Sequence, residues 1–131
     1  MSLKVAIFED DKDLADALKE MLELNSFEAV TVYSLKEASW RTVDVVVADY
    51  RNKIVNFEVL RKACHADGIP VLAISGAETK HRPQLLKPFT TDDLKNGIFQ
   101  SLVHAKEIGL VRKEPESPSL IASLSSWLKG A

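Results

Sequence analysis

Short apolar runs alternate along the chain with segments whose apolar residues recur every three or four positions. Short, β-branched-rich runs are typical of buried strands, and the wider spacing is typical of amphipathic helices. The pattern predicts strands at 4–8, 28–32, 43–48, 70–74 and a very short one at 85–86. It predicts helices at 13–24, 34–40 and 56–66, and a last helix that begins after Thr90 and continues to about residue 105.

This alternation predicts the α/β fold class, as a doubly wound five-stranded parallel sheet. With right-handed crossovers and the flavodoxin-like strand order 2-1-3-4-5, the first and third strands are neighbours. Their carboxyl ends then meet at the topological switch point, where such sheets bind ligands. One interval breaks the pattern, because only eleven residues separate Ser75 from Lys87. We therefore expect helix 4 to be missing or reduced to a turn.

Acidic residues follow two of the predicted neighbouring strands. Glu9 and Asp10 come after the first strand, and Asp49 comes after the third. Clustered like charges destabilise a fold unless a cation lies among them, and carboxylate oxygens suit Mg²⁺. We predict a Mg²⁺ site with Asp10 and Asp49 as direct ligands, Glu9 acting partly through water, and the backbone carbonyl of Arg51 completing the set. The alternative is that the acids after the first strand merely start a helix, which does not explain Asp49.

Four short segments, taken in their order along the chain, together resemble the motifs of a known family. They are IFEDDKDL, DVVVADYR, VLAISGA and LLKPF. Over roughly residues 3–107 the chain resembles the receiver domains of two-component response regulators.

That resemblance implies a reaction and a role for each residue. Asp49 would accept a phosphoryl group from a histidine kinase or a histidine phosphotransfer protein, and Glu9 and Asp10 would hold Mg²⁺. Ser75 would hydrogen-bond one phosphoryl oxygen and Lys87 would pair with another; the alternatives are an ordinary turn residue and a solvated lysine. In-line phosphoryl transfer depends on charge neutralisation and positioning. The domain would promote transfer to its own aspartate without being a turnover enzyme.

Two departures from the receiver pattern leave other functions open. Gln84 stands where a switch aromatic usually precedes the lysine, and the stretch 50–56 lacks the usual Met-Pro turn and glycine. A second hypothesis is therefore a pseudo-receiver, a protein-interaction module that acts without phosphorylation. A metal-dependent phosphohydrolase is a third, although its signature places a second acid where this chain has Arg51.

Composition limits the remaining choices. The chain has 131 residues and a net charge of −2, with scattered basic residues, so we expect no nucleic-acid partner. No apolar run approaches the roughly 20 residues of a membrane helix, so we expect a cytoplasmic protein without membrane association. The lone Cys64 excludes an intrachain disulfide framework and a cysteine-built metal site.

The composition changes near the C-terminus. We predict a receiver domain over 1–108, a linker over 109–119 and an amphipathic segment over 120–131, with five large apolar residues on one helical face. A missing fourth helix would leave an apolar flank, of the kind that marks interaction sites. The amphipathic segment is predicted to cover that flank in its own chain or in a second copy, as a homodimer. The alternative is a frayed terminus.

Overall fold

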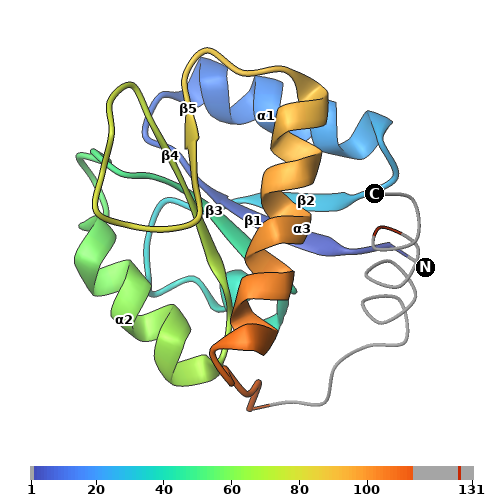
Figure 1. Cartoon of the computed structure of the whole chain (residues 1–131). Helices are drawn as coiled ribbons and strands as arrows, with labels where there is room; N and C mark the ends of the chain where they lie inside the picture. Colours follow the sequence, from blue (N-terminus) through green and yellow to red (C-terminus); the bar gives the residue numbers. More distant parts are fainter. Residues whose placement is uncertain (1, 114–126, 128–131) are drawn as a thin grey trace.

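The computed structural model describes residues 2–113 and Trp127. Its centre is a sheet of five parallel strands in the order β2-β1-β3-β4-β5 (Figure 1). The strands are β1 (Lys4–Phe8), β2 (Glu28–Thr31), β3 (Val45–Asp49), β4 (Val71–Ser75) and β5 (Gln84–Leu86). The helices are α1 (Lys12–Leu24), α2 (Phe57–Asp67) and α3 (Thr91–Glu107), with a short 3₁₀ helix η1 (Ala38–Thr42). The predicted fold class and strand order are confirmed.

Two apolar cores lie on opposite faces of this sheet. Side chains alternate across β1, so that Val5 and Ile7 belong to one core and Ala6 and Phe8 to the other. The first core packs the sheet against α1 and α3, and the second packs it against α2 and η1. Because both faces are covered, the central strands are apolar along nearly their whole length, as expected of a parallel sheet.

The prediction of a short helix at 34–40 is wrong. The 3₁₀ helix η1 begins only at Ala38, and the preceding residues form a turn. The carboxylate of Glu37 accepts a hydrogen bond from the amide of Tyr33 at 2.8 Å, so it does not complete a capping box with Ser34. The buried indole of Trp40 donates to the carbonyl of Leu35 at 3.0 Å, which holds this segment against the sheet.

The predicted beginning of the last helix is confirmed in its hydrogen bonds. The hydroxyl of Thr90 accepts from the amide of Asp93 at 3.1 Å, and the carboxylate of Asp93 accepts from the amide of Thr90 at 3.0 Å. This reciprocal pair is a capping box, which satisfies two amides that the first turn leaves without partners. The helix therefore starts where the sequence pattern places it.

No helix forms between β4 and β5, as the short interval predicted. Bends connect the two strands, and the side chain of His81 contacts α2 and β4 there. Its ring meets that of Phe57 edge-on at 5.1 Å, and its Nε2 lies 2.9 Å from the carbonyl oxygen of Val71. An imidazole thus covers part of the surface that a fourth helix would cover.

The segment that follows α3 packs against the end of α2. The amide of Leu110 donates to the carbonyl of Ala105 at 2.8 Å, and the amide of Lys113 donates to that of Asp67 at 3.2 Å. Apart from Trp127, the predicted segment 120–131 lies outside the described residues. The Trp127 ring stacks on Phe99 of α3 at 5.8 Å. Coverage of the β4–β5 flank by this segment stays a prediction.

Among residues 2–113 and 127, no helix combines the length and the apolar character needed to cross a membrane.

Candidate functional site

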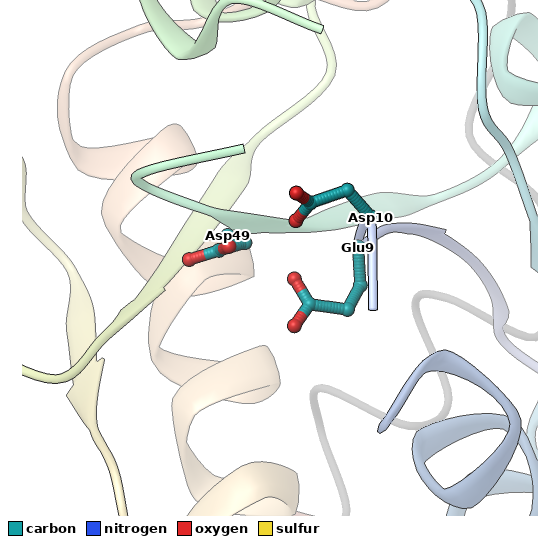
Figure 2. A group of neighbouring side chains, drawn as sticks. All are labelled: Glu9, Asp10 and Asp49. Atoms are coloured by element: carbon teal, nitrogen blue, oxygen red, sulfur yellow. The ribbon is translucent and has the colours of Figure 1, made fainter. Parts of the chain in front are cut away.

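Three carboxylates gather where β1 and β3 end. Glu9 and Asp10 directly follow β1, and Asp49 is the last residue of β3, whose Ala48 pairs with Phe8 in the parallel register. One oxygen from each carboxylate lies within 4.8 Å of the other two. Figure 2 shows Glu9 and Asp10 projecting from the end of β1 towards Asp49. Within the described part of the chain, no other group of three His, Cys, Asp or Glu residues is arranged in this way.

Glu9 is the buried member of this acidic cluster. Its side chain is only 2% exposed; Oε1 lies 3.5 Å from Nζ of Lys87, and Oε2 has no hydrogen-bond partner. Burial, followed by hydrogen bonding to Asp49 and the charge of that residue, raises the pKa of Glu9 to about 7, although Lys87 acts in the opposite direction. An unpaired buried oxygen is costly. A cation within the cluster would remove that cost.

Hydrogen bonds connect the loop after β3 to Asp10 and Asp49, the other two acids of the cluster. Asp49 accepts a hydrogen bond from the amide of Arg51 at 3.3 Å, and Asp10 accepts one from the amide of Lys53 at 3.2 Å. The side chain of Asn52 accepts from the amides of the two residues that follow Lys53, at 2.8 and 2.9 Å. An asparagine-centred turn therefore orders the loop without the Met-Pro and glycine expected there.

Ser75 and Lys87 lie at the same edge of the sheet. Ser75 ends β4 directly after Ile74, which is the partner of Asp49 in the register. The buried hydroxyl of Ser75 accepts from the amide of Ala77 at 3.2 Å, and its carbonyl accepts from the amide of Lys87 at 2.8 Å. Nζ of Lys87 lies 3.9 Å from an oxygen of Asp49, so this ammonium group contacts both Asp49 and Glu9.

The donor set fits a hard cation. The cluster has three carboxylates, of which two contact the ammonium group of Lys87, and one buried carboxylate oxygen has no hydrogen-bond partner. Mg²⁺ prefers oxygen ligands of this kind and commonly takes one or two carboxylates together with phosphate oxygens. The backbone amide of Arg51 donates to Asp49, and the metal-ligand role of its carbonyl stays a prediction.

Several solved structures that are similar to this chain are receiver domains. A CheY-like receiver domain from Methylobacillus flagellatus is 26% identical, with a TM-score of 0.65 over 78% of this chain and 99% of that one. A second, from Methanospirillum hungatei JF-1, is 18% identical, with a TM-score of 0.67 over 83% of this chain and 100% of that one. The chain has the receiver-domain fold.

A third structure, the receiver domain of the Francisella response regulator 1452, is 24% identical, with a TM-score of 0.62 over 82% of this chain and 99% of that one. No protein-family model matches the chain, and no curated protein sequence does. The receiver-domain fold is thus recognised through structure.

Gln84, which replaces the aromatic residue expected before the lysine, is held by polar contacts. Its side-chain oxygen accepts from the amide and the hydroxyl of Thr79, at 2.9 and 2.8 Å, and its amide donates to Glu78 at 2.7 Å. Sequence reasoning did not predict this network or the contact between Lys53 and Asp10. Both involve flexible polar side chains or loop amides, whose partners leave no periodic signal in the sequence.

Proposed function

We propose that this protein is the phosphoacceptor receiver of a two-component or phosphorelay system. Asp49 would take a phosphoryl group from the phosphohistidine of a histidine kinase or histidine phosphotransfer protein, and signalling would follow through protein–protein contacts. The observation that carries the proposal is the cluster of Glu9, Asp10 and Asp49 within 4.8 Å, with Lys87 in contact with two of them. The receiver-domain fold of the chain is consistent with this role.

In the proposed step, an oxygen of Asp49 forms a bond to phosphorus while the phosphorus–nitrogen bond of the donor breaks. The donor imidazole leaves with the electron pair of that bond. Charge on the transferred group is spread over its three remaining oxygens, so catalysis consists mainly of positioning and neutralisation. Lys87 would neutralise one of these oxygens and Ser75 would donate a hydrogen bond to another. The aspartate itself is modified, so the step is not enzymatic turnover.

The acidic cluster would hold Mg²⁺ through Asp10, Asp49 and Glu9, with the carbonyl of Arg51 as the predicted fourth protein ligand. When bound, Mg²⁺ supplies Lewis-acid neutralisation of phosphoryl charge. The buried, unpaired Oε2 of Glu9 supports this assignment, because a metal-bound or water-bridged oxygen no longer carries the full cost of desolvation.

Intact-protein mass spectrometry tests the acceptor directly. We expect incubation with acetyl phosphate and Mg²⁺ to add the mass of one phosphoryl group to the wild-type chain. Asp49→Ala should abolish that gain, whereas Asp16→Ala, which removes an exposed acid from α1, should keep it. A wild-type chain that gains no mass, or an Asp49→Ala chain that still gains it, would contradict the proposal.

The polar network around Gln84 favours one alternative, a pseudo-receiver that acts as a protein-interaction module without phosphorylation. Gln84 replaces the ring that usually relays the signal, so the signalling face of this chain differs from the expected one. Titration with Mg²⁺ tests the cation site on which the phosphoacceptor depends, through the fluorescence of Tyr50, which packs against Phe57 at 4.9 Å beside the acceptor. A response that is lost in Asp10→Asn supports the phosphoacceptor, and no response supports the pseudo-receiver.

A further inference from the structure

All three histidines of the chain line one cavity of about 240 Å³. They come from three separate elements: His65 lies on α2, His81 lies between β4 and β5, and His104 lies on α3. The cavity also includes Val71, the first residue of β4. It therefore lies where β4 and β5 begin, at the opposite edge of the sheet from Asp49.

The cavity lining combines basic and apolar groups. Arg61 and Arg82 join the three histidines, and no aspartate or glutamate is among the lining residues. Most of the other lining is apolar and includes Ile69, Pro83 and Ile108. Binding sites for small molecules typically have this character, with apolar walls and a few polar groups that fix the orientation of the ligand. A cavity of about 150 Å³ is enough to hold benzene, so this one has room for a single-ring molecule.

Two carboxylates outside the cavity orient its arginines. Arg61 pairs with Glu58, and Nη2 of Arg82 lies 3.0 Å from Glu78. Nη1 of Arg82 also donates to the carbonyl oxygen of His81 at 2.9 Å. The guanidinium groups are therefore held in place, and their formal charges are balanced by acids that lie outside the cavity lining.

Positive charge inside the cavity depends on the imidazoles. The pKa of His81 is lowered by burial above all, and the charges of Arg61 and His104 act in the same direction; the Val71 carbonyl and Glu58 oppose the shift. The carboxyl ends of α2 and α3 also lie at this edge of the sheet, and their partial negative charge opposes an anion. Anion binding here should therefore be accompanied by proton uptake on the imidazoles.

We propose that this cavity binds a small organic anion, whose acidic group meets the histidines and arginines and whose apolar body packs against Ile69, Pro83 and Ile108. A metal site is disfavoured by the geometry, because the three imidazoles do not form a cluster with ligand atoms within 4.8 Å in the part of the chain that the structure describes. The proposal is independent of phosphorylation, since none of its residues belongs to the acidic cluster around Asp49.

Benzenesulfonate is a suitable probe because its charge stays constant while imidazoles titrate. We would add it to the full chain in EDTA and follow the imidazole proton resonances of the three histidines by NMR. We expect saturable shifts, with affinity at least about fivefold higher than for benzyl alcohol or inorganic sulfate. Benzyl alcohol has the apolar ring without the negative charge, and sulfate has the charge without the ring. Affinity should rise as the pH falls, because a bound anion favours the protonated form of the imidazoles.

Variants test whether the cavity is responsible. His104→Gln and Arg82→Gln should each weaken binding at least about fivefold, by removing an imidazole and a guanidinium group, respectively, from the lining. Lys62→Gln is the matched control, because Lys62 is exposed beside Arg61 on α2 but does not line the cavity; its affinity should stay within about twofold of wild type.

Three results would overturn the proposal. They are the absence of saturable histidine shifts in the wild-type chain, equal affinity for benzyl alcohol and benzenesulfonate, and an effect of Lys62→Gln as large as that of the cavity variants. Stoichiometric shifts with Zn²⁺ in a chain without EDTA, together with none from benzenesulfonate, would instead identify a metal site. The wild-type comparisons decide the question even if a cavity variant does not fold.

Discussion

Glu9 titrates in a buried position beside Asp49 and Lys87, so the stability of the metal-free protein depends on its protonation. Its pKa is about 7 in the folded chain, against an ordinary value of 4.5. The folded state therefore holds this proton more tightly than the unfolded state does. The resulting stabilisation is fully present below about pH 4.5 and is lost as the pH rises through about 7.

We therefore expect Glu9 to lower the free energy of unfolding in EDTA by up to roughly 3 kcal/mol between about pH 5 and about pH 8. Urea denaturation of wild type and Glu9→Gln at both pH values measures this contribution. The pKa of His81 is lowered, so His81 acts with the opposite sign, and the comparison with Glu9→Gln isolates the carboxyl group. Equal pH dependence in the two proteins would contradict the assignment.

The end of helix α2 depends on one glycine. Gly68 ends the helix with a φ of +74°, and the segment after α3 passes directly over it. A Cβ at this position would overlap the carbonyl group of Val111, whereas Gly109, with a φ of +72°, has open space around it. The two glycines share the same backbone requirement but differ in their surroundings.

Gly68→Ala should therefore destabilise the protein more than Gly109→Ala does. The left-handed conformation alone costs an alanine about 1–2 kcal/mol, which we expect for Gly109→Ala. Gly68→Ala should cost at least about 1 kcal/mol more, because the segment after α3 must move. Chemical denaturation of both variants gives the difference. Gly76→Ala, at an open position without a positive φ, serves as the control and should change stability little. Equal losses at Gly68 and Gly109 would show that the segment does not pack on α2.

Sequence periodicity was sufficient to predict most of these elements, because the strands are apolar on both faces and the long helices have regular apolar spacing. It failed at 34–40, where burial of Trp40 and the side chain of Glu37 override a local capping pattern. The absence of a fourth helix was also predicted, because the eleven residues between Ser75 and Lys87 are too few for a loop, a helix and a strand. The contact of His81 with Phe57 was not predictable, because it depends on tertiary packing across separate elements.

In the candidate site, too, the sequence pattern predicts some features, and others depend on tertiary packing. Strand order brings Glu9, Asp10 and Asp49 to one edge, and sequence alone was enough to expect their proximity. The hydrogen bond from Lys53 to Asp10 and the unpaired Oε2 of Glu9 depend on loop geometry and burial, which the sequence pattern does not contain. The predicted roles of Ser75 and Arg51 stay predictions.

If the acidic cluster holds Mg²⁺ as proposed, it should couple cation binding to the folding of the whole molecule. Its ligands come from two strands and meet only in the folded sheet, so Mg²⁺ should bind the folded state and raise the free energy of unfolding. At a Mg²⁺ concentration about 100 times the dissociation constant, we expect a gain of about 2.7 kcal/mol. The gain at a fixed, subsaturating Mg²⁺ concentration should be larger at about pH 8 than at about pH 6, because the proton on Glu9 competes with the cation.

Thermal and urea unfolding with Mg²⁺ or EDTA at the two pH values measures this coupling. Asp10→Asn removes one carboxylate from the cluster and should abolish most of the gain, whereas Asp16→Asn removes an exposed charge from α1 and should retain it. A gain of the same size in Asp10→Asn would mean that Mg²⁺ acts elsewhere on the protein. If Mg²⁺ stabilises the wild-type chain but acetyl phosphate adds no mass, the cluster is a cation site without acceptor chemistry, and the pseudo-receiver becomes the better description.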